Sequence, residues 1–348
     1  MVWAVFVLLV LVILAFDLGI LSRESKALTA REALIRTGAY FVLALMFTVF
    51  VYFAYENKWF GLGVYDEVKV EAGHGPKMTA LPANGLEAAA QFFMGYILEQ
   101  SLSIDNIFVI ALILAYFQVP AALQHRVLLW GILGALVMRG VMIYLGIELI
   151  HRFAFTMYIF GALLLYTAFK MLFAGEGEVD FENSRMVRIT RRFFRLHPSF
   201  VDDHFFTRVD GKLAMTPMFL ALVIVETTDL VFAIDSIPAV IGLTQDPFLV
   251  FTSNVFAILG LRSLYFALAD LLGRFHYLKY SLVAILAFVG IKMLVHDFLP
   301  HEQTSLITLV SLAFIAIALG VGIGASLMLP EKHDPEPESA PDPESQPS

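Results

Sequence analysis

The sequence predicts an all-α integral membrane protein of about nine transmembrane helices. Of its 348 residues, 59% are hydrophobic and only 16% are charged, whereas a soluble protein is roughly 45–50% apolar and about 25% charged. The mean hydropathy of +0.78 agrees with this class. The apolar residues run together rather than alternate, which indicates helices and not a barrel.

Apolar stretches long enough to cross a bilayer recur along the whole chain, and a crossing helix needs about 20 such residues. We expect spans at 2–21, 34–55, 87–116, 124–148, 153–173, 216–242, 248–272, 279–297 and 304–329. The first stretch lacks both a basic n-region and a small-residue cleavage site. We therefore interpret it as a membrane helix and not as a removed signal peptide.

The distribution of Lys and Arg predicts the orientation of these spans. Basic residues gather in alternate loops, most densely in 174–214, and basic loops stay in the cytoplasm. The N-terminus should therefore face outside and the C-terminus the cytoplasm. Within this loop, MVRITRRFFRLHPSF (186–200) is interpreted as a helix lying on anionic lipid, with a regulatory role as the alternative.

Composition also excludes some classes of function. The tail 330–348 holds six Pro and six acidic residues, so it should be disordered. There is no basic surface suited to nucleic acid. The chain has no Cys, which excludes disulfides, thiolate metal sites and thiol redox chemistry within it. No nucleotide-binding loop is present, and we expect neither enzymatic activity nor a tightly bound cofactor.

Three pairs of segments indicate an internal repeat. SIDNI (103–107) matches AIDSI (233–237), and an acidic residue precedes each central Asp by six positions. GALVMRGVMIYLG, from residue 134, matches AILGLRSLYFALA, from residue 257. YTAFKMLF (166–173) matches FVGIKMLV (288–295). The order Asp, Arg, Lys thus recurs in helices 3–5 and 6–8.

A unit of three spans reverses the direction of the chain, so the second copy must be inverted. Inverted repeats are typical of secondary transporters, which bind their substrate at the repeat interface. The expected organisation comprises two N-terminal helices, repeat 1, the basic cytoplasmic loop, repeat 2, helix 9 and the tail. Their boundaries are 1–55, 87–173, 174–214, 215–297, 304–329 and 330–348.

Acidic residues inside the predicted spans are the candidate functional groups. An acid at mid-helix costs about 2.5–3.5 kcal/mol on insertion scales, and such residues usually mark an ion or proton path. They lie in spans 3 and 6, with one more in span 1: Glu99, Asp105, Glu226, Asp229, Asp235 and Asp17. The alternative is a set of structural or gating ion pairs with Arg139, Arg262 and Lys292.

These acids, together with the amide oxygen of Asn106, form a candidate set of oxygen ligands. Such ligands suit hard divalent ions such as Mg²⁺, Ca²⁺ and Mn²⁺. Crowded carboxylates also bind protons, so exchange of the ion for H⁺ is expected. Pro238 cannot donate to the carbonyl of Ile234, and we expect a break or unwound turn at 234–238 that frees this oxygen.

The longest of these segments resemble a known family. EQSLSIDNIFV, VETTDLVFAIDSIPAV, FTSNVFAILGLRSLYF and GIKMLVHDF are similar to the characteristic segments of the TerC/Alx family of bacterial membrane proteins. The resemblance extends from span 1 through span 9 and excludes the tail. It implies a fold of three-plus-three inverted repeats in the bacterial inner membrane and manganese export as the role of Alx-like members. It also implies functional acids at positions 105, 226, 229 and 235.

Two other functions stay open at this point. The first is a non-transporting membrane scaffold or stress-response factor, in line with tellurium resistance, the historical label of the family. The second is export of a small organic cation, which the aromatic residues Phe108 and Phe232 would favour. Membrane lipids are expected partners, and protein partners are open.

Overall fold

The structure is a computed structural model. It describes residues 2–17, 30–65, 81–153, 155–173, 195–197, 199–201, 204–209, 212–268, 278–295 and 304–328. The predicted tail therefore lies outside the described residues, as does most of the basic loop.

Each predicted span corresponds to an α-helix in the described residues, so the all-α membrane class is confirmed. The helices are α1 Val2–Asp17, α2 Ala30–Glu56, α4 Gly85–Tyr116, α5 Ala121–Arg152, α6 Thr156–Phe173, α8 Pro217–Ile241, α9 Pro247–Leu268, α10 Leu278–Leu294 and α11 Thr304–Met328. A 3-10 turn, η1 Trp59–Gly61, follows α2. Five of the described helices, namely α2, α5, α6, α8 and α9, are long and apolar enough to cross a membrane.

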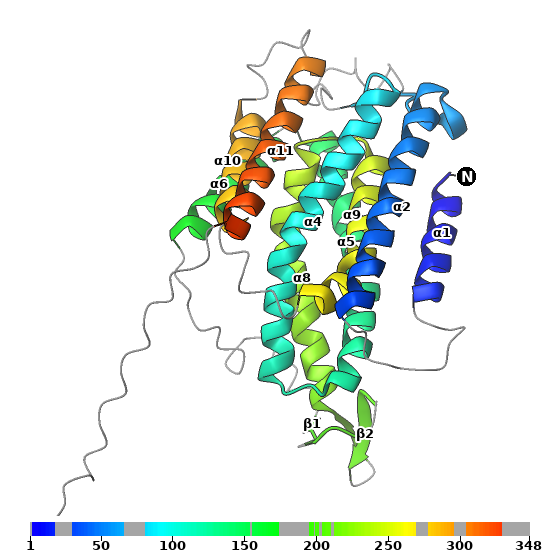
Figure 1. The fold of residues 1–348 in the computed structure, drawn as a ribbon, viewed down its shortest axis with the longest axis vertical. Coiled ribbons are helices and arrows are strands. Elements are labelled where there is room, and N and C mark those ends of the chain that lie inside the picture. Colours follow the sequence, from blue (N-terminus) through cyan, green and yellow to red (C-terminus); the bar gives the residue numbers. More distant parts are fainter. Residues whose placement is uncertain are drawn as a thin grey trace, which may run out of the picture.

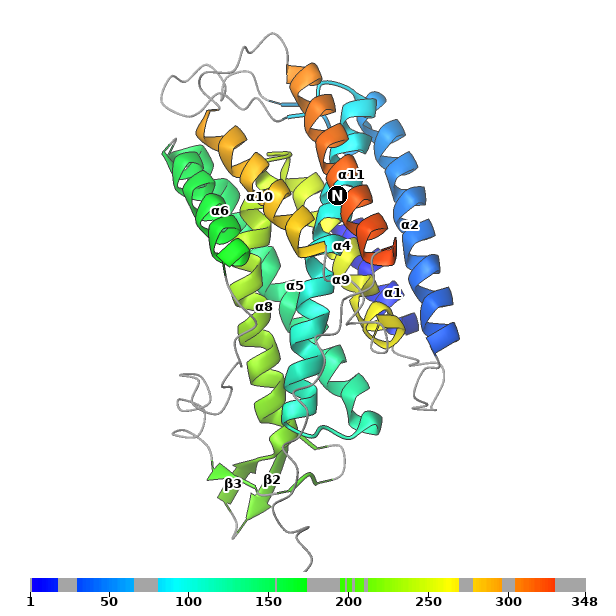
Figure 2. The ribbon, with the colours of Figure 1, turned by 60° about the vertical axis from the view of Figure 1, so that its left-hand side comes forward.

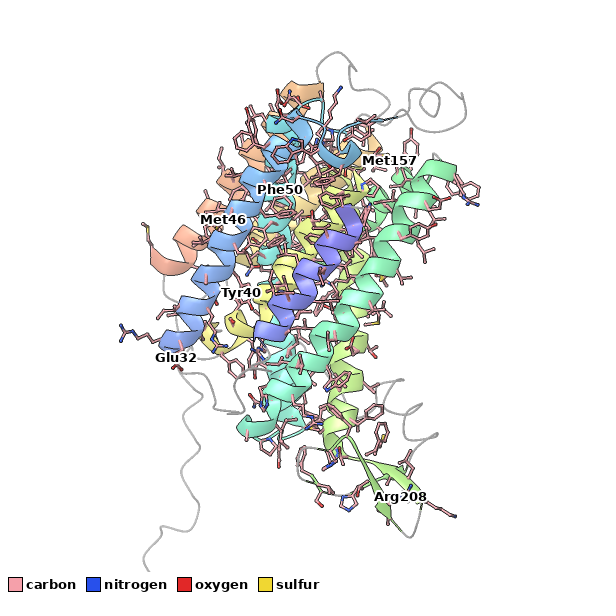
Figure 3. All side chains as sticks on the ribbon, turned by 90° about the vertical axis from the view of Figure 1, so that its right-hand side faces the viewer. Glu32, Tyr40, Met46, Phe50, Met157 and Arg208 are labelled. Carbon is pink, nitrogen blue, oxygen red and sulfur yellow. The ribbon has the colours of Figure 1, made fainter. Side chains whose placement is uncertain are left out.

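A small sheet marks one end of the helix bundle (Figure 1). Strands β2 Phe206–Val209 and β3 Lys212–Met215 form an antiparallel hairpin, and β1 Arg195–Leu196 pairs with β3 in parallel. We call this the hairpin end. Figure 3 shows Arg208 at this end and Met157, at the start of α6, far from it.

The sheet corrects the expectation of a surface helix over 186–200. Arg195 and Leu196 are strand residues, because their backbone groups pair with Ala214 and Met215 of β3. The rest of that basic segment up to residue 194 lies outside the described residues. The side chain of Thr216 fastens the sheet to α8, since its hydroxyl donates to the carbonyl of His204 at 2.9 Å.

From α4 onward, helices that follow one another along the chain run in opposite directions through the bundle (Figures 1 and 2). α4 begins at the end opposite the hairpin, where Asn84 caps it by accepting the N–H of Glu87 at 2.9 Å. α8 begins at the hairpin end with Pro217 in its first turn. α4 packs against α9, α5 against α8 and α6 against α10. These pairings join the two predicted halves and agree with an inverted repeat, which itself stays a prediction.

Glycines allow α6 and α10 to cross closely. A Cβ atom at Gly290 would lie 2.9 Å from the carbonyl oxygen of Gly161, and a Cβ at Gly161 would lie 2.9 Å from the carbonyl oxygen of Gly290. Small residues at such crossings let helix backbones approach in lipid, where no hydrophobic force drives helices together. This crossing attaches α10 to the rest of the bundle.

The core contains a central, enclosed helix. α9 is the most deeply buried of the five long apolar helices. α2, α4 and α5 pack around it. On the α1 side, Phe6 contacts Phe256 with ring centroids 6.1 Å apart, and Trp3 contacts Phe248 at 5.4 Å. Because α9 is shielded from lipid, it can carry the polar residues Thr252, Ser253 and Asn254.

α8 also differs from expectation at its far end. The helix runs unbroken from Pro217 to Ile241 with Pro238 inside it, so the predicted break at 234–238 is not found. Pro238 lies near the helix end, where its carbonyl still accepts the N–H of Gly242 at 2.9 Å. A proline in this position removes one backbone bond without unwinding the turn.

Candidate functional site

Arg139 lies at the centre of a buried ion-pair network. From α5 its Nη1 donates to Glu99 Oε2 of α4 at 2.8 Å. Its Nε and Nη2 donate to Asp229 Oδ2 and Oδ1 of α8 at 3.1 and 2.9 Å. The exposed fractions are 2% for Arg139, 1% for Glu99 and 14% for Asp229. A forked contact of this kind gives Arg strong geometric preference for a carboxylate.

Asn254 extends the network to the fourth core helix. Its Nδ2 donates to Glu99 Oε1 at 2.7 Å from α9. Both oxygens of Glu99 are thereby occupied, one by an amide and the other by the guanidinium group. The four helices α4, α5, α8 and α9 thus meet at one polar point. For Glu99 and Asp229 this arrangement agrees with the ion-pair alternative considered above.

Glu226 lies one helical turn from Asp229 on α8, towards the hairpin end. Its side chain lies against α5 at Gly134, where a Cβ atom would overlap the carboxylate. The Glu226 Oε2 atom is buried and has no hydrogen-bond partner within the described residues. The absence of a side chain at position 134 therefore makes room for this carboxylate in the interface between α5 and α8.

Asp235 occupies a different interface, between α8 and α6. Its Oδ1 accepts a hydrogen bond from the hydroxyl of Thr167 at 2.8 Å. Lys170, one turn further along α6, lies within electrostatic range. Asp235 is half-buried and does not contact the Arg139 network through any recorded hydrogen bond or ion pair of the described residues. The structure therefore separates Asp235 from Glu226 and Asp229.

The remaining predicted residues fall into two groups. Asn106 is buried on α4, Arg262 is buried on α9 within electrostatic range of His125, and Lys292 is partly buried in the last turn of α10. The side chains of Asp105 and Asp17 lie outside the described residues, although both backbones are helical. The part of the site that depends on them stays a prediction.

The described residues hold no group of three or more His, Asp or Glu side chains placed to bind one metal ion. The predicted acids with described side chains are instead divided among three places: the Arg139 network, the α5–α8 interface at Gly134 and the α6–α8 interface. Sequence reasoning missed Asn254, Thr167 and Gly134. Asn254 lies in FTSNVF, a polar interruption of an apolar span, and this interruption was the available signal.

A second polar cluster lies outside the spans, at the end opposite the hairpin. Asp246 caps α9, since its Oδ1 accepts the N–H groups of Phe248 at 2.8 Å and Leu249 at 3.1 Å. Its Oδ2 accepts the hydroxyl of Tyr65 at 2.8 Å. Burial raises the pKa of Asp246 above its ordinary value, although these hydrogen bonds act in the opposite direction. The contact joins the segment after α2 to the turn between α8 and α9.

A family model matches most of the chain and shows the family to which it belongs. The model of the integral membrane protein TerC family matches residues 84–334, which contain every residue of the Arg139 network. The chain belongs to the TerC family. The match begins at the cap of α4 and continues past α11, so α1 and α2 precede the shared TerC region.

Relatives within this family share most of the chain. An "Uncharacterized membrane protein STKORF319" of Myxococcus xanthus is 40% identical over 335 residues, covering 96% of this chain and 93% of that protein. A "Putative membrane-bound redox modulator Alx" of Escherichia coli K12 is 42% identical over 297 residues, covering 85% and 86%. An "Uncharacterized membrane protein" of Rickettsia felis is 35% identical over 318 residues, covering 91% and 96%. No solved structure matches the chain significantly.

Proposed function

We propose that this TerC family protein is a secondary transporter that exports hard divalent metal ions, with Mn²⁺ as the expected ion, in exchange for protons. The observation that carries the proposal is the excess of carboxylates around Arg139. Glu99, Asp229 and the adjacent Glu226 outnumber the single guanidinium group that contacts the first two. When all three acids are ionised, their negative charges exceed the positive charge of Arg139 by two, which complements one divalent cation.

The placement of Glu226 supports this proposal further. A carboxylate oxygen that is buried without a hydrogen-bond partner is costly, and more so within a membrane. Either a cation or a proton removes that cost, so alternate binding of the two species follows from the same group. The basic segments at the hairpin end support a cytoplasmic location for that end. Glu226 would then face the side from which the ion is taken up.

Flux measurements in proteoliposomes test this function. Purified protein should move Mn²⁺ across the bilayer, and an opposing proton gradient should accelerate the movement. Glu226→Gln and Asp235→Asn should each lower the rate at least tenfold. Glu148→Gln is the matched control, because Glu148 is 37% exposed and its ion pair within the described residues is with Arg152, and it should leave the rate unchanged. Equal rates for wild-type protein and Glu226→Gln would refute transport through this site.

The second candidate is a membrane scaffold or stress-response factor that does not transport ions. Two observations favour it: Glu99 and Asp229 are both already paired with Arg139, and a 42% identical relative carries the name "Putative membrane-bound redox modulator Alx". Because this chain has no cysteine, thiol chemistry would have to come from a partner protein. A scaffold should tolerate Glu226→Gln and respond instead to changes in the exposed hairpin, such as Arg208→Glu.

A further inference from the structure

A buried polar row on α4 faces α9 and leads away from the Arg139 network. Gln91, Gly95 and Glu99 follow one another at intervals of four residues, which places them on one helix face. Gly95 identifies the neighbour of that face, because a Cβ there would lie 2.9 Å from Ser253 Oγ. Glu99 contacts the next residue of α9, Asn254. Gln91 therefore continues this interface towards the end at which α4 begins.

Two amides in this α4–α9 interface have polar atoms without hydrogen-bond partners in the described residues. Both the oxygen and the nitrogen of the Gln91 side chain are buried and unpaired, and so is Asn254 Oδ1. Each residue is only 1% exposed. A buried polar group without a partner loses its hydration and gains nothing in exchange, which costs free energy. Leucine at position 91 would pack with no such cost, so a purely structural role does not explain the glutamine.

A second buried polar position, Glu226 on α8, lies on the other side of the Arg139 network. α4 begins at the end opposite the hairpin, so Gln91 lies nearer that end than Glu99 does (Figure 2). α8 begins at the hairpin end, so Glu226 lies nearer the hairpin than Asp229 does. The order along the bundle is therefore Gln91, then the Arg139 network, then Glu226. Buried polar atoms without hydrogen-bond partners occur on both sides of the network.

We propose that Gln91 and Asn254 line the outer half of a cation route, that Glu226 and the space at Gly134 form its inner half, and that the Arg139 network closes the route in this structure. The ligand class is a hard divalent cation, because amide and carboxylate oxygens suit such ions. This inference rests on the proposed function and adds the residues and helix pairs that the ion passes. The outer half lies between α4 and α9, and the inner half lies between α5 and α8.

Labelling of single cysteines tests the route without measuring transport. The chain has no native cysteine, so each variant carries one thiol. A cationic, membrane-impermeant thiosulfonate reagent is added to intact cells and to inverted vesicles. Asn57→Cys, exposed after α2, identifies which preparation presents the end opposite the hairpin. Gln91→Cys should react in that same preparation.

Ala89→Cys is the matched control for this labelling. Ala89 is also buried and lies nearer the start of α4, but two residues along a helix place it on the opposite face from Gln91. It should stay unlabelled on both sides. If Gln91→Cys reacts in neither preparation, or if Ala89→Cys reacts equally, the proposed route is overturned.

Gln91→Leu provides an independent second measurement. The variant should slow Mn²⁺ flux in proteoliposomes at least fivefold while its thermal stability equals or exceeds that of wild-type protein. Wild-type flux in this variant would overturn the role of Gln91 and leave the proposed function intact. Lack of Mn²⁺ flux in wild-type protein would instead refute the proposed function, and cysteine labelling would still decide whether the row admits a cation.

Discussion

Replacing Arg139 by Met removes the guanidinium group that joins Glu99 to Asp229 and keeps most of the side-chain volume. Removing one partner of a buried ion pair costs about 3–5 kcal/mol, because the other charge is left buried. Glu99 is 1% exposed and carries this cost in full, whereas Asp229, at 14%, is partly relieved by solvent. We expect Arg139→Met to lower the free energy of unfolding by about 3–5 kcal/mol.

Reversible denaturation of the purified protein in mixed micelles measures this loss. The same change should cost far less in a Glu99→Gln, Asp229→Asn background, where no buried charge is left unpaired. Arg152→Met is the control, since its pair with Glu148 is exposed and worth about 0–1 kcal/mol. If Arg139→Met costs the same in both backgrounds, the network does not stabilise the protein through its charges.

Three further outcomes are expected. Gly134→Ala should displace the Glu226 carboxylate and lower Mn²⁺ flux at least tenfold, whereas Gly131→Ala, whose Cβ would lie 3.4 Å from its nearest neighbour, should not; equal flux in the two variants would contradict this role. Wild-type protein should lose thermal stability as the pH rises through the raised pKa of Asp246, since a carboxyl group with a raised pKa favours the folded state only while protonated, and Asp246→Asn should abolish this loss. Parallel pH profiles of thermal stability for the two proteins would contradict this role of Asp246. Gly290→Ala should separate α6 from α10 and cost about 1–3 kcal/mol in a denaturation experiment, with Gly320→Ala, which meets no atom within 4 Å, as the neutral control; equal stabilities would show that the crossing is not tight.

The helices could be predicted from the sequence because lipid imposes one rule on every span. A stretch of about 20 apolar residues has no alternative to a helix in the bilayer, so even α9, with Thr252, Ser253, Asn254 and Arg262, was predicted. The segment around Arg195 was not, because its strand depends on pairing with Ala214, distant in the sequence. Amphipathic spacing alone does not show such a partner.

The site was predicted in its residue types and only partly in its arrangement. An acidic residue within a span is conspicuous in the sequence because its insertion into lipid costs free energy, which is why Glu99, Glu226 and Asp229 were all candidates. Which acids form one group depends on which basic side chain the packing places beside them, and here Arg139 bonds to one acid of α4 and one of α8. The sequence identified Glu226 and Asp229 as candidate acids of one span but could not show that Gly134 would accommodate Glu226.

The residues of the Arg139 network enter the membrane in a defined order during synthesis. Glu99 and Arg139 are 40 residues apart on consecutive helices, so both reach the membrane early in synthesis. Asp229 follows Arg139 by 90 residues. Helices α4 and α5 can therefore enter lipid as an antiparallel helix pair in which the charges of Glu99 and Arg139 already cancel. The later helix α8 then delivers Asp229 to a guanidinium group that is in place, which spares it the cost of an unpaired acid in the bilayer.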